Sequence, residues 1–438
     1  MLAIAVTFLL LGIDLSLFSL KRTHLFVPVL GAAYILSQFL RSSNAVVAPE
    51  LQLDMALSPA DIGTLTGAYF LIFALVQVPV GVFLDRVGPK LVMSIMVLFA
   101  ALGCLVYANA EGFWSLSVGR GLMGLGCASI LMGAYVVFAR WFPKDKFSTY
   151  AAMNITIGNL GILLATLPLS AVVQGYGWRT AFNWAAIASL VVALLLYAVI
   201  KDEPDNAPKN AHLDISLLES FMQLGIILKN KTFWTFVPLM LVGYSSVATI
   251  ITLWSGPYLE AVLGMDTIAR GEVLLLMGAG AMLGPMLLGH LDRYFDTRKY
   301  IVFVGVSLSI VIFILLAFLP NLGTTGTSAL FFFMAVTPGY LSVFMAHVRA
   351  IYPDHLVGRG MTLANVANMG GVALFQVITG YVLEAVLAKT GDIAQAYSAI
   401  FILLGGVLFI ALMIYMRSDD IKPSQQRISD EENKPVLS

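Results

Sequence analysis

The sequence predicts an all-α protein that crosses a membrane many times, and three observations support this. Its 438 residues are 59% hydrophobic and only 11% charged, whereas soluble proteins carry about a quarter charged residues. Mean hydropathy is +0.89. Most apolar runs reach about twenty residues, the length that a helix needs to cross the hydrocarbon layer. A long polar interruption divides these runs into two groups of six, which predicts two helical bundles.

Twelve membrane helices follow in chain order from these runs. They are predicted at 26–48, 61–84, 89–109, 114–139, 148–173 and 180–200, and then at 233–259, 270–291, 299–319, 327–351, 359–387 and 394–416. The predicted domains are the bundles 25–201 and 233–417, the linker 202–232 and the tail 418–438.

Residues 1–24 contain an extra apolar segment with Asp14 in its middle. A buried carboxylate disfavours insertion by about 3 kcal/mol. A thirteenth span, a loosely held helix and a misplaced start codon therefore remain open for this segment.

Lysine and arginine residues set the predicted orientation. Twenty of the 25 fall on one side of the membrane, three fall on the other, and Arg41 and Arg120 lie within helices. Because basic residues favour the cytoplasmic side, both ends of the twelve-helix unit are predicted to be cytoplasmic, in a bacterial-type inner membrane.

The two bundles repeat each other at a nearly fixed offset. The matching pairs are Pro49 and Pro257, Leu51 and Leu259, Gly63 and Gly271, Gly81 and Gly289, Pro143 and Pro353, and Gly161 and Gly371. An ordered series of this kind indicates a duplicated six-helix unit, as in secondary transporters.

The stretch GVFLDRVGPK places a dense polar cluster between the second and third helices. Its Gly81, Asp85, Arg86, Gly88 and Lys90 match the signature loop of the major facilitator superfamily, which the chain resembles over residues 25–417. The second copy keeps Asp292 and Arg293, followed by Arg298 and Lys299. The resemblance implies a transporter whose bundles rock, with this loop helping to hold the outward-facing state.

Elementary chemistry gives this loop a role without the resemblance. Gly81 allows a neighbouring helix to approach closely, and Gly88 allows a tight reversal. Asp85 is expected to accept from amide groups at the start of an adjoining helix, and Arg86 and Lys90 to pair with nearby acids or carbonyls. The loop is therefore predicted to gate the cytoplasmic side.

Two arginines inside the membrane point to the substrate. A buried guanidinium is costly unless it meets water, a partner or an anion, so Arg41 and Arg120 predict an anion site. Tyr34, Gln38 and Asn44 share a helix face with Arg41, which predicts a lining for the same cavity.

The second bundle offers polar candidates for the opposite wall. These are Ser245, Thr249 and Thr252 on the seventh helix, and Asn365, Asn368, Gln376 and Thr379 on the eleventh. Hydrogen bonding between helices is an equally good interpretation of such residues.

The first and fourth helices are partly similar to the organic-anion branch of the superfamily. Arg41 and Asn44 approach that branch's D-R-x-N pattern, although Leu40 replaces its acid and Asn44 is one residue late. Arg120 and Gly124 match the fourth-helix motif, and Cys127 stands where the branch has a carboxylate. The resemblance implies an anionic substrate without that branch's proton-handling pair.

Four ionisable side chains are the candidates for carrying a coupled proton, if the transporter uses one. His347 lies on the tenth helix, and Glu260, Glu272 and Glu384 lie near predicted outer helix ends. A structural role for the histidine is the alternative. The fifth helix lacks the Gly-Pro pair of drug antiporters, which favours uptake over efflux.

The sequence thus predicts a monomeric secondary transporter for a small anionic metabolite, with uptake or symport favoured and a proton or cation as the candidate co-substrate. Proton-coupled efflux and a non-transporting sensor are the alternatives. No enzyme, metal, cofactor or nucleic-acid partner is expected, because no paired buried acids, ligand spacing or basic tract occurs.

Overall fold

The computed structural model describes residues 25–143, 146–203, 232–319, 322–352 and 357–424, and the regular structure in these ranges is entirely helical. The predicted extra segment 1–24, nearly all of the linker 202–232 and most of the tail 418–438 lie outside the described residues.

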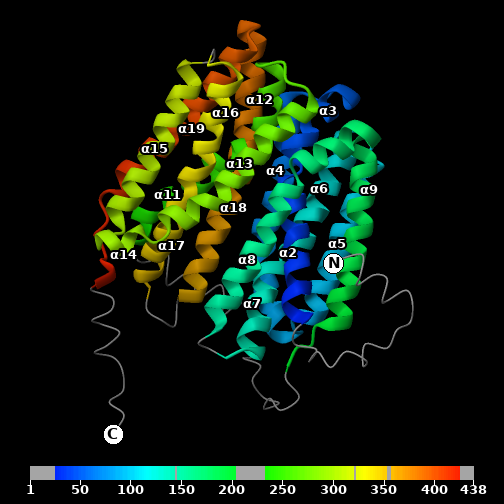
Figure 1. Ribbon diagram of the computed structural model, residues 1–438, viewed down its shortest axis with the longest axis vertical. Helices are drawn as coiled ribbons and strands as arrows, with labels where there is room; N and C mark the ends of the chain where they lie inside the picture. The colour runs from blue at the N-terminus through cyan, green and yellow to red at the C-terminus, as the bar shows by residue number, and fades with distance from the viewer. Residues whose placement is uncertain (1–24, 144–145, 204–231, 320–321, 353–356, 425–438) are drawn as a thin grey trace.

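Two bundles of helices stand side by side (Figure 1). The first contains α2 (Phe26–Ser42), α3 (Asn44–Met55), α4 (Pro59–Arg86), α5 (Pro89–Ala108), α6 (Phe113–Cys127), α7 (Ile130–Trp141), α8 (Phe147–Leu164) and α9 (Leu167–Val199). The second contains α11 (Phe233–Thr249), the π-helix η4 (Ile250–Trp254), α12 (Ser255–Ala261), α13 (Thr267–Leu288), α14 (Leu291–Phe295), α15 (Lys299–Phe318), α16 (Gly323–Val336), η5 (Thr337–Gly339), α17 (Tyr340–Ala350), α18 (Val357–Thr390) and α19 (Ile393–Tyr415).

The described helices supply the twelve predicted spans. Ten stretches are long and apolar enough to cross a membrane, and Phe26–Ser42 is a shorter apolar helix. One of the ten, Phe147–Val199, has 53 residues, more than twice the length of one crossing. It contains non-helical Gly177 (φ 80°, ψ 158°), and dividing it there gives the fifth and sixth spans.

Local sequence signals account for several helix starts. Ser58 and Asp61 form a reciprocal capping box at the start of α4, which has Pro59 as its first residue. Asp266 and Asp392 accept from backbone amides at the starts of α13 and α19. Such caps satisfy amides that the helix itself cannot bond.

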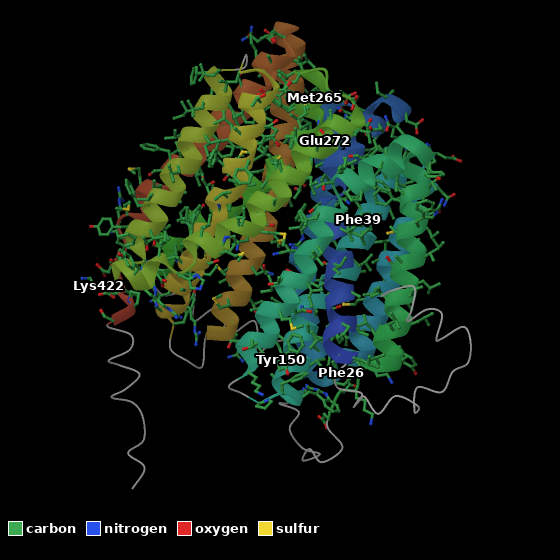
Figure 2. The ribbon with its side chains drawn as sticks, in the orientation of Figure 1. Phe26, Phe39, Tyr150, Met265, Glu272 and Lys422 are labelled. Carbon is green, nitrogen blue, oxygen red and sulfur yellow. The ribbon has the colours of Figure 1, made fainter. Side chains whose placement is uncertain are left out.

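Figure 2 shows the two ends of the molecule. Met265 and Glu272 lie toward one end, Phe26 and Tyr150 lie toward the other, and Phe39 lies between them. The first is the predicted outer end and the second is the predicted cytoplasmic end.

Small residues bring the two bundles into contact in the half of the molecule toward the predicted outer end. Cβ atoms added to Gly63 and Gly380 would collide with backbone across the α4–α18 seam. One on Gly256 of α12 would collide with the Ala45 carbonyl of α3, and one on Gly271 of α13 would collide with Ser170 of α9. These collisions show that the bundles are packed together at that end, since only glycine permits such close approach.

Two aspartates cap helix N-termini at equivalent positions of the two bundles, at the predicted cytoplasmic end. Asp202, just after α9, accepts from the Lys90 amide at the start of α5 over 2.8 Å. Asp420, just after α19, accepts from the amides of Arg298 and Lys299 at the start of α15, over 3.1 Å each. Each bundle thus ties its last helix to its third through a carboxylate at a helix N-terminus.

Candidate substrate site

Arg120 lies on α6 and is completely buried. Its Nη1 donates to the Leu40 carbonyl on α2 over 2.9 Å, and its guanidinium carbon lies 5.1 Å from the centre of the Tyr69 ring. Among the residues that the structure describes, its Nε and Nη2 have no hydrogen-bond partner. Two charged donors in the protein interior are therefore left to bind something else.

A break in the first span gives Arg120 its acceptor. The turn at Ser43 separates α2 from α3, and the Ser43 hydroxyl also donates to the Leu40 carbonyl over 3.1 Å. A carbonyl at the end of a helix needs partners from outside that helix. Arg120 therefore braces the broken first span as well as carrying charge.

Arg41 is partly exposed and lies on α2, two residues before this break. Its guanidinium carbon lies 5.1 Å from the centre of the Phe73 ring, and its buried Nε has no hydrogen-bond partner within the described ranges. Its charge acts on the hydroxyls of Tyr69, Tyr244 and Tyr34. Because Tyr244 belongs to α11, the charge of Arg41 acts on groups of both bundles.

The two arginines form one electropositive region. Tyr69 and Cys127 each lie within electrostatic reach of both guanidinium groups. In the part of the chain that the structure describes, neither arginine forms an ion pair with a carboxylate. Unpaired buried positive charge favours an anionic ligand, because burying a lone charge costs free energy that a bound anion recovers.

The other predicted residues of the first span differ in whether their polar atoms already have hydrogen-bond partners. Tyr34 packs its ring against Gly158 of α8, and Gln38 donates to Asn159 over 3.4 Å while its Oε1 remains unpaired. Asn44 is fully buried, and it donates to Thr66 and accepts from the Tyr107 hydroxyl. Both ends of its amide are occupied, so Asn44 ties α3 to α4 and α5 instead of offering free polar atoms.

The predicted residues of the second bundle likewise differ in whether their polar atoms are hydrogen-bonded. Gln376 donates to Thr252 over 3.0 Å, and Thr379 accepts from the Trp254 indole over 2.8 Å. These bonds join α18 to η4 within the bundle. Gln376 retains one unpaired oxygen, Oε1.

Asn365 instead reaches across to the first bundle, where it donates to Gln77 of α4 over 3.3 Å. Asn368 Oδ1 and the hydroxyls of Ser246 and Thr249 are buried, and they have no hydrogen-bond partner in the described part of the chain. These neutral groups are the remaining candidates for the opposite wall.

The loop between α4 and α5 contains the signature motif. Its Gly81 does not contact the second bundle, because a Cβ added there would meet no atom of the described residues within 4 Å. The close approach predicted at Gly81 is thus absent in this conformation. Gly88 adopts φ +97°, as a tight reversal requires, and lies against the Asp202 carboxylate, while its predicted role in gating stays a prediction. The Asp202 carboxylate accepts from the Lys90 amide at the start of α5, which is the kind of contact that was predicted for Asp85.

The remaining loop residues lie at the molecular surface or within their own bundle. Asp85 and Arg86 are exposed, and Lys90 places its ammonium 4.3 Å from the Tyr197 ring centre. In the second copy, Asp292 lies 3.6 Å from Arg298, while Arg293 is exposed.

The four candidates for proton coupling are dispersed. His347 is buried against Tyr415 (2.7 Å) and the Asp419 carbonyl (3.0 Å) at the predicted cytoplasmic end. Glu260 pairs with Arg270, Glu384 accepts from the Ala60 amide over 3.1 Å, and Glu272 is exposed. None of these contacts places a candidate beside Arg41 or Arg120.

Sequence reasoning missed a face of α4 near the arginines that carries two aromatic residues and one amide. Tyr69, Phe73 and Gln77 recur every four residues along α4, so they share one face of that helix. This spacing was a detectable signal. No sequence pattern pointed to Tyr244, because its proximity to the charge of Arg41 depends on how α11 packs against the first bundle.

Comparison with known proteins matches this architecture. The family model of the Major Facilitator Superfamily matches residues 30–375 and 280–438. A hexuronate transporter of Bacillus subtilis (strain 168) is 24% identical over 385 residues, covering 86% of this chain and 90% of the relative. A probable sulfoacetate transporter of Cupriavidus necator is 24% identical over 439 residues, covering 93% and 98%.

Among solved structures, a bacterial homologue of the human lysosomal transporter Spinster superposes with a TM-score of 0.74 at 19% identity, covering 91% of this chain and 97% of that one. The matched family model spans most of the sequence, and the two-bundle fold agrees with it. The chain is therefore a member of the major facilitator superfamily, a transporter and not an enzyme.

Proposed function

We propose that this transporter moves a small organic anion across the inner membrane, with Arg41 and Arg120 binding its charged group. The single observation that carries the proposal is the pair of arginines without a carboxylate partner in the described residues. The two similar proteins named above, for hexuronate and sulfoacetate, take anionic substrates and support the same class.

The aromatic and neutral groups around the arginines suit the rest of such a molecule. Tyr34, Tyr69 and Tyr244 supply hydroxyls, and Phe73 supplies an apolar face beside Arg41. A site that combines charge with hydroxyl groups favours a carboxylate or sulfonate that also carries hydroxyls. We propose uptake by a monomer, with both ends of the twelve-helix unit in the cytoplasm.

Ligand-induced thermal stabilisation tests this proposal. Hexuronates, sulfoacetate, neutral sugars and organic cations should be screened against the purified protein, since a ligand that binds the folded state raises Tm. We expect anions alone to raise Tm, and Arg41→Gln to remove that response. Arg349→Gln is the matched control, because Arg349 is exposed at the predicted cytoplasmic end.

Arg120 needs a second variant, because it also braces α2. Arg120→Lys keeps the charge and one donor for the Leu40 carbonyl, so it should fold and retain part of the response. Stabilisation by cations or lipophilic drugs, with no effect of either arginine variant, would favour the efflux alternative instead.

A further inference from the structure

A three-residue ion cluster crosses the seam between the bundles at the predicted outer end. Arg270 of α13 is 5% exposed. Its Nη2 donates to Glu50 Oε1 on α3 over 2.6 Å, and its Nη1 donates to Glu260 Oε2 on α12 over 2.7 Å. Thr267 of α13 also donates to Glu50 Oε1 over 3.1 Å.

The cluster is divided unequally between the bundles. Glu50 belongs to the first bundle, while Arg270, Thr267 and Glu260 all belong to the second. If the bundles separate at this end, Glu50 leaves and Glu260 stays with Arg270. Separation therefore breaks one ion pair and leaves the arginine partnered.

The closely packed seam surrounds this cluster. Gly256 lies against the Ala45 carbonyl beside it, and Gly271 follows Arg270 directly and packs on Ser170. The side chains of Arg270 and Glu50 are 6% and 22% exposed, so water screens their pairing only partly.

Other charged groups at this end have their own roles. Asp54, one turn from Glu50, pairs with Arg179 of its own bundle. Asp61 caps α4, Asp266 caps α13, and Glu384 accepts from the Ala60 amide across the α4–α18 seam. Glu272 is exposed. Among these side chains, Glu50 is the acid that reaches an arginine of the opposite bundle.

We propose that Glu50, Arg270 and Thr267 form an ion-pair gate that holds the predicted outer end closed, and that Glu260 keeps Arg270 paired when the gate opens. Alternating access requires the bundles to separate at this end. This proposal rests on the chain's membership of the transporter family, and it does not depend on the charge of the substrate.

Distance measurements between spin labels test the gate without any substrate. Glu111→Cys and Thr324→Cys place labels on exposed sites at the predicted outer ends of the two bundles, and the native Cys104 and Cys127 are buried. We expect Glu50→Gln to raise the population with long distances about fivefold or more, the effect of losing one partly buried ion pair.

Two variants make the test specific. Glu260→Gln leaves the pair across the seam intact but removes the acid that pairs Arg270 in the open state, so we expect it to lower the population with long distances or leave it at the native level, and not to raise it. Asp54→Asn removes an ion pair within the first bundle and should also leave them unchanged. An unchanged distribution in folded Glu50→Gln, or an equal shift in Asp54→Asn, would overturn the proposal, whatever the substrate proves to be.

Discussion

The two bundles share a scaffold but differ in the chemistry that they bring to the centre. The first carries Arg41 and Arg120, neither of which has a carboxylate partner among the described residues, while the second contributes Tyr244 and neutral groups such as Thr249 and Asn368. At the predicted cytoplasmic end the bundles are alike, because Asp202 and Asp420 make equivalent helix caps. The bundles thus share a contact that maintains their shape, whereas the charged groups of the proposed site come from the first bundle.

The largest expected effect comes from removing charge in the first bundle. Arg41→Gln should lower the rate of anion transport about 100-fold or more, because it removes one of the two charged groups proposed to bind the anion. Arg41→Lys should retain part of the rate. Uptake of labelled anion into proteoliposomes measures both variants, and similar rates for Arg41→Gln and the native protein would contradict the asymmetry.

A smaller effect is expected on stability at Gly88. This residue adopts φ +97° against the Asp202 carboxylate, so Gly88→Ala forces an alanine into a strained conformation and a collision. We expect a loss of about 2 kcal/mol or more, seen as a lower Tm in detergent. Gly112→Ala is the control, because Gly112 has extended backbone (φ 179°) and open space around it.

The two aspartate caps should contribute similarly, at about 1 kcal/mol each. Asp202→Ala and Asp420→Ala are therefore expected to lower Tm by comparable amounts. A large effect of one variant and none of the other would show that the equivalent geometry does not reflect equivalent energetics.

Acid should weaken the Asp420 cap. Burial alone would raise the pKa of Asp420, but bonds from the Thr297 hydroxyl and the Lys299 and Arg298 amides outweigh it and hold the pKa below the ordinary value. The cap therefore stabilises the fold above the ordinary carboxylate pKa and is lost as pH falls through the lowered value. The Tm difference between native protein and Asp420→Ala should shrink as pH falls from 7 to below 4.

The smallest effect belongs to the second bundle's side of the site. Tyr244→Phe removes one neutral hydroxyl near Arg41, so we expect two- to tenfold weaker apparent affinity with little change in Tm. Titration of anion-induced Tm shifts measures this. An effect as large as that of Arg41→Gln would mean that the bundles bind substrate equally.

Much of the fold could be predicted from the sequence, because hydropathy, basic loops and an internal repeat are local signals. The contacts that the site residues make were harder to predict from the sequence. Asn44 shares a helix face with Arg41, yet it is tied to Thr66 and Tyr107. The link between Glu50 and Arg270 joins residues 220 positions apart, and no helical spacing encodes such a contact.

Transport of a charged solute tests the central claim most directly. The anion with the largest stabilising effect should be followed into proteoliposomes containing native protein, Arg41→Gln, Arg120→Lys or Arg349→Gln. We predict rapid uptake by the native protein and Arg349→Gln, reduced uptake by Arg120→Lys and almost none by Arg41→Gln. Equal uptake by all four proteins would contradict the assignment of Arg41 and Arg120 as the anion site.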